Sequence, residues 1–500
     1  MASVLIPYPS DLFTPLPGES VGEWLEKGDP YYNAARTPLN TFALLIALHC
    51  WPMPAWIPPG RCVAWLTRLF AAVSIFGLEM QVATWLSLAT IRSLTLLNLA
   101  IAAAAVAMAY WKGSRASRVA VAPTPPASTV YIVSACLLFA LVLTLNMMRP
   151  VLAADPYHLD RMAQIERLGT IGYDLAAEPK VNSFGWAYEL VLADIHQIPS
   201  VGGVLLRFHG LFGIALYLLA LSAARTWLLV KREWLLVALL VVPVVFHQFV
   251  LIKNDLFGAV PAVAVLAWLI GRSADAKPRE IAWAAWLCGL AVAVKVTSAP
   301  LALVLAGTLL VQRTDRAAVI RAGVAGGLAG LLCGGFFFTM IENARVYGSP
   351  ITAFKESGGM GNRNESVDQA AVSVVRFGIS LFDLGRYTRA AWPGRGGWGS
   401  TFGLPLIWAF AVLARYRRRP EVRRSLWIAV VYMVVFAAIY TDADIAHRLL
   451  LGPGLLLILV ASSVSDGEDR LSRLSRAALC AVITLSALQI ARSATLYLGS

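Results

Sequence analysis

Apolar runs of about 20 residues recur along most of the chain, the length that an α-helix needs to cross the hydrocarbon core of a bilayer. The runs do not alternate between apolar and polar residues as the strands of a membrane barrel do, so they predict helices. Composition agrees, because 58% of the residues are hydrophobic and 14% are charged. A soluble domain carries roughly a quarter charged residues. The sequence therefore predicts an all-α, multi-pass membrane protein.

We expect a bundle of about 11–14 transmembrane helices, a number set by apolar runs that each match the thickness of a bilayer. The expected spans lie near 39–57, 64–88, 91–111, 129–148, 201–223, 233–252, 256–271, 280–297, 299–312, 322–341, 402–414, 425–441, 449–464 and 477–498. Short spans such as 299–312 are candidates for tilted or broken helices. Three regions are predicted: extra N-terminal spans in 1–128, a core in 129–464, and a loop with a final helix in 465–500.

The basic residues give the predicted orientation. The formal net charge is +13, but the basic residues form no single stripe of the kind that binds nucleic acid. They cluster in alternate loops, which is typical of the cytoplasmic face: 112–118, 225–232, 272–279, 313–321, 415–424 and 470–476. The remaining loops, including the long segments 149–200 and 342–401, then face the periplasm or cell exterior. We expect an inner (plasma) membrane protein with its active site on that outer face; the side of Met1 stays open.

Two further features exclude a cleavable targeting segment and a cysteine-based site from the predictions. The first residues lack a basic segment followed by an uninterrupted apolar run, so no cleavable signal peptide is expected. The six cysteines are far apart and mostly lie in or beside apolar runs. Their spacing fits neither a metal site nor a disulfide framework.

The first long outer loop, 149–200, holds two candidate amphipathic helices, at 156–168 and 183–196. We expect both to lie in the plane of the membrane interface. Glu189 and Asp194 are expected on the solvent-facing side of the second helix. In the other long loop, 342–401, the glycine-rich stretch that begins at Trp392 indicates flexibility, and we expect this loop to close over the site.

Ionisable residues gather on the predicted outer face, close to the membrane. Charges near hydrocarbon are costly, about 2.5–3.5 kcal/mol at a helix centre, so each needs a partner, a watery cavity or an escape to the interface. The group comprises Asp155, His158, Lys253, Asp255, Lys295, Asp442, Asp444, His447 and Arg448.

Each of these residues also has a purely structural explanation. Asp155 precedes a proline, the order of a helix N-cap followed by proline at the first helical position. His158 is able to pack against its neighbours or bond a backbone carbonyl. Lys253 and Lys295 are able to extend their ammonium groups to the interface, and Arg448 to anchor the end of a span.

A single hypothesis explains them together: a transferase whose donor is a sugar on a polyprenyl phosphate. The leaving group is an anion, so cations must receive it, and arginine suits that task. The acceptor hydroxyl must lose a proton, so a carboxylate base is needed within hydrogen-bond reach. The lipid chain needs an apolar groove between helices, which places the site at the membrane boundary.

Five motifs, in order along residues 129–464, resemble those of GT-C type membrane glycosyltransferases. The branch they resemble is that of the bacterial protein O-mannosyltransferases and aminoarabinose transferases. Asp155-Pro-Tyr-His158-Leu is similar to that branch's acidic loop motif, with Pro156 in place of the usual second acid. The other four are Leu251-Ile-Lys253-Asn-Asp255, Gly289-Leu-Ala-Val-Ala-Val-Lys295, Asn343-Ala-Arg-Val-Tyr347-Gly-Ser-Pro350, and His447-Arg448-Leu-Leu-Leu.

This resemblance implies a GT-C-like fold and an inverting, mannosyltransferase-like transfer of a hexose or pentose. Its motifs imply that Asp155 is the general base, with His158 beside it. Arg448, Lys253 and Lys295 would bind the donor phosphate. Further substrate contacts are implied for Tyr157, Asp255, His447, Asn343 and Tyr347. Since Pro156 removes the second acid, no metal site and no cofactor is expected. The acceptor would be a glycan, lipid or protein of the cell envelope.

Two other classes of protein compete with this interpretation. A transporter or flippase of lipid-linked or anionic substrates would carry its charges at mid-membrane, in related halves interrupted by breaks. Here the charges gather at one face and no matching halves are found. A non-catalytic scaffold, or a polymerase or ligase of surface polysaccharide, would not need Asp155.

Overall fold

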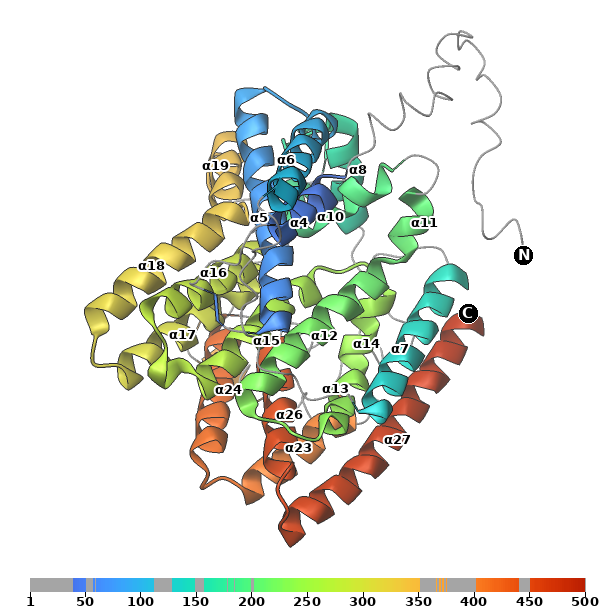
Figure 1. The fold of residues 1–500 in the computed structure, drawn as a ribbon, viewed down its shortest axis with the longest axis vertical. Helices are drawn as coiled ribbons and strands as arrows, with labels where there is room; N and C mark the ends of the chain where they lie inside the picture. Colours follow the sequence, from blue (N-terminus) through green and yellow to red (C-terminus); the bar gives the residue numbers. More distant parts are fainter. Residues whose placement is uncertain are drawn as a thin grey trace.

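The computed structural model in Figure 1 describes residues 39–50, 57–58, 60–111, 128–148, 157–177, 179–183, 185–198, 202–350, 366, 368–369, 371–372, 375, 402–439 and 450–499. Within these ranges the regular secondary-structure elements are all helices. Six of them are long and apolar enough to cross a membrane, or up to seven if a bent pair forms one span, and shorter apolar helices accompany them. The all-α, multi-pass prediction is confirmed.

Four helices from the N-terminal part of the chain flank the bundle: α4 (Asn40–Cys50), α5 (Arg61–Leu86), α6 (Ile91–Trp111) and α7 (Thr129–Met148). The bounds of α6 and α7 agree with the expected spans. The first turn of α4 is held by the Asp194 carboxylate, which accepts hydrogen bonds from the backbone N–H groups of Asn40 (3.2 Å) and Thr41 (2.9 Å). A carboxylate at a helix N-terminus bonds free N–H groups and complements the helix dipole. Asp194 is therefore a buried cap, and the prediction that it faces solvent is wrong.

Three short helices lie toward one end of the molecule in Figure 1: α8 (Tyr157–Leu168), α10 (Ala187–His196) and α11 (Gly202–Arg207). A fourth, α9 (Pro179–Ser183), packs against α8. The predicted helix at 156–168 is confirmed. The second is shorter than predicted, and every residue from 187 to 194 is buried. Helices α4, α5, α8 and α11 pack around it, so α10 is covered by other helices. Glu189, predicted to face solvent, is also buried.

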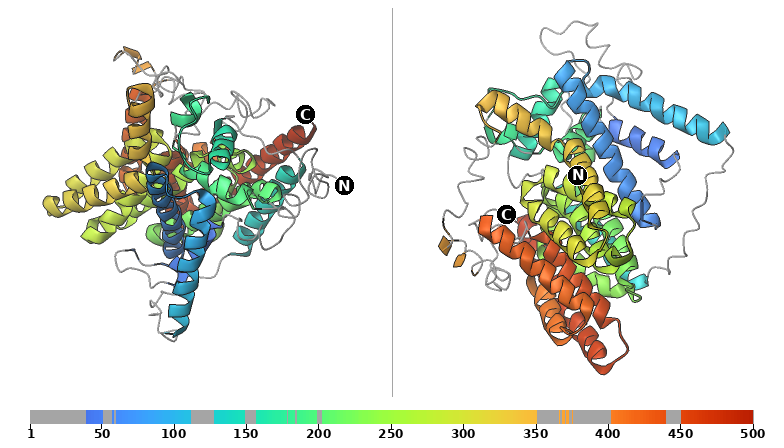
Figure 2. Two further views of the ribbon diagram at one scale, coloured as in Figure 1. Left: turned by 90° about the horizontal axis from the view of Figure 1, so that it is seen from above. Right: turned by 90° about the vertical axis from the view of Figure 1, so that its left-hand side faces the viewer.

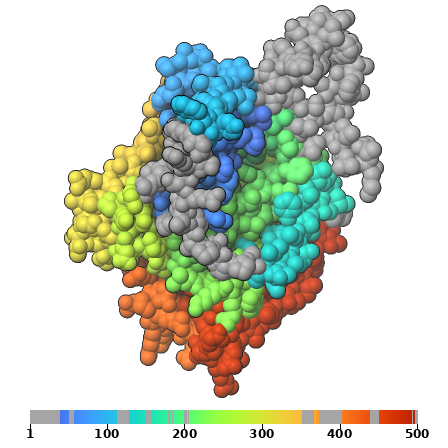
Figure 3. All heavy atoms as spheres, in the orientation of Figure 1, coloured from blue at the N-terminus to red at the C-terminus, as the bar shows by residue number. Residues whose placement is uncertain are grey.

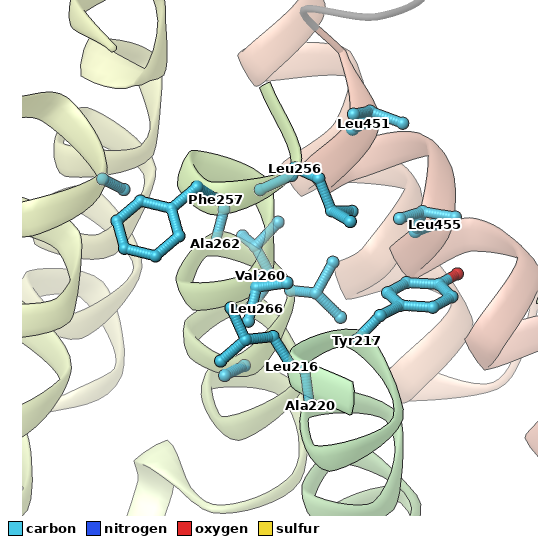
Figure 4. Close-up of a cluster of buried hydrophobic side chains, with 14 of the residues drawn as sticks. Leu216, Tyr217, Ala220, Leu256, Phe257, Val260, Ala262, Leu266, Leu451 and Leu455 are labelled. Carbon is cyan, nitrogen blue, oxygen red and sulfur yellow. The ribbon is translucent and has the colours of Figure 1, made fainter. Parts of the chain in front are cut away.

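The middle of the chain forms the core: α12 (His209–Leu228), η2 (Glu233–Leu236), α13 (Val237–Leu240), α14 (Pro243–Val250), α15 (Asp255–Gly271), η3 (Ser273–Asp275), α16 (Pro278–Val294), η4 (Val296–Ser298) and α17 (Ala299–Gln312). Helix α15 is buried along almost its whole length and packs between α12 and α26, as Figure 4 shows. The predicted span 233–252 is bent by 66° before Pro243, since proline cannot donate the helical hydrogen bond.

The C-terminal helices are α18 (Arg316–Cys333), α19 (Phe336–Tyr347), α23 (Gly403–Arg415), α24 (Pro420–Ile439), α26 (Leu451–Ser465) and α27 (Arg470–Gly499). The predicted single span 322–341 is wrong, because the helix breaks at Gly334 and Gly335. Gly335 has φ +82°, a conformation that only glycine adopts without strain. Figures 2 and 3 show α18 projecting from the bundle as an edge, and its apolar residues are mostly exposed, as suits contact with lipid.

The bundle thus has two ends. The end with α8, α10 and α19 is called the pocket end below, and the end where α26 joins α27 is called the opposite end (Figure 1). At the opposite end, ion pairs link separate helices. Arg225 bonds Glu233 at 2.8 Å, and Arg232 bonds both Asp466, at 3.0 Å, and Glu468.

Candidate active site

A small pocket lies at the pocket end, where the first residues of α8, α15 and α19 meet the last residues of α16. Its volume is about 60 Å³. Five of its side chains are polar: Tyr157, Asn254, Lys295, Thr297 and Thr339. The rest of its wall is mostly apolar, with Phe336 and Met340 from α19 and the segment Val292–Val294 from α16. An apolar pocket with a few convergent polar groups is the usual form of a ligand site.

Gly185 sets how closely α10 approaches the end of α16. A Cβ atom at this position would stand 2.4 Å from the backbone oxygen of Ala293 and 3.0 Å from that of Val294. No side chain fits such a distance. The chain entering α10 therefore rests directly on the main chain of α16, and Gly185 itself lines the pocket.

Lys295 presents the most accessible charge of the pocket. It follows the last residue of α16, and its ammonium forms an ion pair with Asp255 and lies 3.4 Å from Oδ1 of Asn254. Asp255 begins α15, and its side chain is 2% exposed, against 18% for Lys295. A carboxylate in this position is stabilised by both the ammonium and the helix dipole. The buried acid thus keeps the lysine at the pocket wall.

Lys253 brings a second ammonium to the turn that precedes α15, next to Asn254 and Asp255. Its side chain is buried, and Nζ lies 3.2 Å from Nδ1 of His247 on α14. Tyr188, on α10, hydrogen-bonds the backbone of Lys253. Burial, and next the charge of Glu189, raise the pKa of Tyr188, so its phenol stays protonated while its oxygen accepts the hydrogen bond from the backbone N–H of Lys253. His247 and Tyr188 are thus contacts of the site that the sequence did not indicate.

His158 is held behind the pocket wall by a buried acid. Its Nδ1 lies 2.5 Å from Oε1 of Glu189, and both side chains are 1% exposed. The His158 ring packs against that of Tyr157, with 4.0 Å between centroids, and Tyr157 lines the pocket. With Glu189 ionised, Nδ1 of the imidazole donates this hydrogen bond, which fixes the ring. The pair therefore holds the start of α8 against α10.

Asn343 and Tyr347 lie one and two turns beyond Thr339 on α19, and both belong to a polar network. The Tyr173 hydroxyl donates to Oδ1 of Asn343 at 2.7 Å, and Nδ2 of Asn182 donates to the Tyr347 hydroxyl at 2.9 Å. Neither residue lines the pocket. The two side chains join α19 to the loop after α8 and to α9.

Arg161 completes this network from inside α8. It is 1% exposed and donates to the backbone oxygens of Ile171 (2.8 Å) and Gly172 (3.1 Å) and to Gln164. Burial lowers the pKa of Arg161 to about 10, so the guanidinium remains charged at neutral pH. Buried charge with several hydrogen-bond partners is costly to disturb, and no sequence pattern pointed to this residue.

The structure brings five of the predicted site residues together: Tyr157, His158, Lys253, Asp255 and Lys295. Asn343 and Tyr347 stand nearby, in the network just described. The other three predicted residues, Asp155, His447 and Arg448, lie outside the described residues. Within the described ranges, no three His, Cys, Asp or Glu side chains come together as a metal site requires.

Comparison with known proteins now defines the class. The sequence profile of glycosyltransferase family 87 matches residues 191–439, a segment that contains Lys253, Asp255, Lys295, Asn343 and Tyr347. Neither the comparison with curated proteins nor that with solved structures gives a match. The fold and the profile together define a multi-pass membrane glycosyltransferase of the GT-C class.

The chain is thus a glycosyltransferase whose segment 191–439 matches glycosyltransferase family 87. A glycosyltransferase needs a sugar donor and an acceptor, so the enzyme class confirms the predicted transferase and sets aside the transporter interpretation. The likeness to the protein O-mannosyltransferase and aminoarabinose transferase branch stays a prediction, as do the division into three regions and the absence of a metal.

Proposed function

We propose that this enzyme takes a sugar from a polyprenyl-phosphate donor and transfers it, with inversion, to an acceptor on the outer side of the membrane. The observation that carries the proposal is the pocket itself. It places the Lys295 ammonium, the Asn254 amide and the Tyr157 phenol around one small space at the end of an apolar bundle. A space of this size suits the phosphate group of such a donor, whose lipid chain stays among the helices.

In this mechanism Lys295 receives the negative charge that develops on the leaving phosphate, and Lys253 supports it from the turn that precedes α15. Arg448 is a further phosphate ligand, and His447, Asn343 and Tyr347 contribute contacts to substrate or to the shape of the site. Asp155, two positions before Tyr157 in the sequence, takes the proton of the acceptor hydroxyl. Cations preorganised at a developing anion and a well-placed base each lower the barrier. His158, fixed by Glu189, acts by positioning.

An apolar cavity supports the choice of a lipid-linked donor. It lies between α23, α24 and α26, has a volume of about 200 Å³, and is lined only by apolar residues, among them Phe410, Met433 and Leu457. Leu450, at its rim, is two positions after Arg448. Hydrocarbon chains bind such cavities because apolar surface leaves contact with water. The donor's isoprene units would enter between these helices.

The distribution of basic residues supports the orientation. Arg225 and Arg232 lie at the opposite end, where Arg232 pairs with Asp466, and Arg415 ends α23 beside Tyr416, which bonds Asp469 between α26 and α27. Cytoplasmic loops are rich in arginine and lysine, so the pocket end faces outward. We place the protein in the inner (plasma) membrane, with a glycan, lipid or protein of the cell envelope as its acceptor.

The decisive test replaces Asp155 by asparagine. In proteoliposomes supplied with polyprenyl-phosphate sugars and envelope acceptors, Asp155→Asn lowers the rate of sugar transfer about a hundredfold or more, as expected for loss of a general base. The matched control is Asp160→Asn, because Asp160 is an exposed carboxylate on α8. Both variants should elute from size exclusion like the wild type. Transfer by Asp155→Asn at the normal rate contradicts the proposal.

A further inference from the structure

We infer that Asp255 acts as a charge filter: its carboxylate weakens the binding of the more highly charged lipid product more than the binding of the donor. This inference rests on the proposed function and concerns the same pocket. The donor of such a transferase is a phosphodiester, which carries a single negative charge. The product is a phosphate monoester, which carries about 1.5–2 negative charges at neutral pH. Both molecules share the same lipid chain, so only the phosphate distinguishes them.

The geometry gives Asp255 a direct influence on that phosphate. Its carboxylate contacts the Lys295 ammonium, and Lys295 lines the pocket. Asp255 is the first residue of α15, and its side chain is 2% exposed. Solvent therefore screens its charge poorly, and its effect on a neighbouring anion is larger than that of a surface carboxylate. Asn254, which precedes it, also lines the pocket and contacts Lys295.

A lysine at a phosphate site does not need a buried acid in order to bind an anion. An ammonium without a carboxylate partner would attract the phosphate more strongly, and it would attract the doubly charged product most of all. The contact with Asp255 reduces this attraction, and the reduction grows with the charge of the ligand. Specificity between two ligands is often obtained by repulsion of the wrong one. Here the repelled ligand is the enzyme's own product.

The consequence concerns turnover. Transfer of the sugar converts the bound diester into the monoester without moving the lipid chain, so the product would otherwise stay in the site. The gain of negative charge next to Asp255 weakens binding at that moment. Product release then becomes easier at the same step in which the chemistry is completed.

The test compares two inhibitors of equal chain length, polyprenyl phosphate and its methyl phosphodiester, against sugar transfer by the purified full-length enzyme. In Asp255→Asn, the inhibition constant of the monoester falls about tenfold, because a poorly screened unit charge acts on the additional charge of the ligand. The inhibition constant of the diester falls by a smaller factor. Asp255→Glu retains the charge and keeps the wild-type ratio of the two constants.

A matched control removes a carboxylate from an ion pair elsewhere. Asp315→Asn breaks the pair with Arg313, where α17 joins α18, and leaves both inhibition constants unchanged. If Asp255→Asn is too slow to assay, direct binding of the two labelled lipids to the purified variant gives the same ratio. Equal changes for the two inhibitors, or none, overturn the charge filter. If neither lipid inhibits or binds the wild type, the proposed donor is wrong and the inference falls with it.

Discussion

Charged residues are used differently at the two ends of the helical bundle. At the opposite end, the cluster of Arg232 with Asp466 and Glu468 reaches solvent, with Glu468 78% exposed, whereas the Arg225–Glu233 pair is buried there. At the pocket end, Asp255, His158 and Glu189 are almost completely buried. Asp255 contacts Lys295 and His158 packs on Tyr157, and both Lys295 and Tyr157 line the pocket, which no residue of the Arg225–Glu233 pair does.

The difference shows what each set of charges is for. Exposed ion pairs contribute about 0–1 kcal/mol each and tolerate change, so the pair of Arg232 with Glu468 only fastens loops. A buried charge costs several kcal/mol to desolvate. Its retention beside a pocket is typical of a functional site. Three substitutions sharpen or break this comparison.

The largest effect is expected at Lys295. Lys295→Met keeps much of the side chain's length but removes the charge that faces the leaving phosphate. The rate of sugar transfer should fall about a hundredfold or more, the usual result when one preorganised charge at a developing anion is lost. Arg232→Met, at the opposite end, should retain more than half of the wild-type rate. Similar losses in both variants would show that the two ends do not differ in function.

A large loss of stability, rather than of chemistry, is expected at Arg161. Arg161→Met leaves the backbone oxygens of Ile171 and Gly172 without their buried donor, which should lower the free energy of unfolding by about 3 kcal/mol. The control on the same helix is Arg167→Met, since that side chain is 62% exposed and pairs only at the surface. Thermal unfolding in detergent measures both. A normal melting temperature for Arg161→Met would mean that burial does not decide the importance of a charge.

The smallest effect is expected at His196, a half-exposed residue of the pocket end. Its hydrogen bond to Glu166, at 2.7 Å, raises the pKa of the imidazole above its ordinary value. The pair therefore stabilises the fold fully below about pH 6.5, the pKa of an unperturbed histidine, and the stabilisation is lost as pH rises through the higher folded-state pKa. His196→Gln should remove this slope of melting temperature between pH 6 and pH 8. A slope that persists in the variant assigns the pH dependence to other groups.

Much of the fold follows from apolar run length. The expected spans at 91–111 and 129–148 have the same bounds as α6 and α7, because a long apolar run has one stable form in a membrane. The length of the apolar run did not predict the break between α18 and α19. Gly334 and Gly335 stand inside a continuous apolar run, and hydropathy does not register a positive φ angle.

The site was predictable where a charge interrupts an apolar run. Lys253, Asp255 and Lys295 stand out for that reason, and the structure brings them together. Glu189 and Asp194 do not stand out, since helical periodicity shows a polar side but not whether other helices cover it. Their partners, His158 and Asn40, come from other parts of the chain. Such pairings depend on tertiary packing, which a single sequence does not encode locally.

The glycine at position 185 also bears on how this enzyme can diverge. Because α10 rests there on bare main chain, one boundary of the pocket is rigid and offers no side chain to exchange. The facing boundary consists of Phe336 and Met340, whose volumes are free to change without moving a helix. Relatives that accept bulkier or slimmer sugars should therefore differ on α19 first, whereas any residue larger than glycine at position 185 would displace α10 and the buried acid it carries.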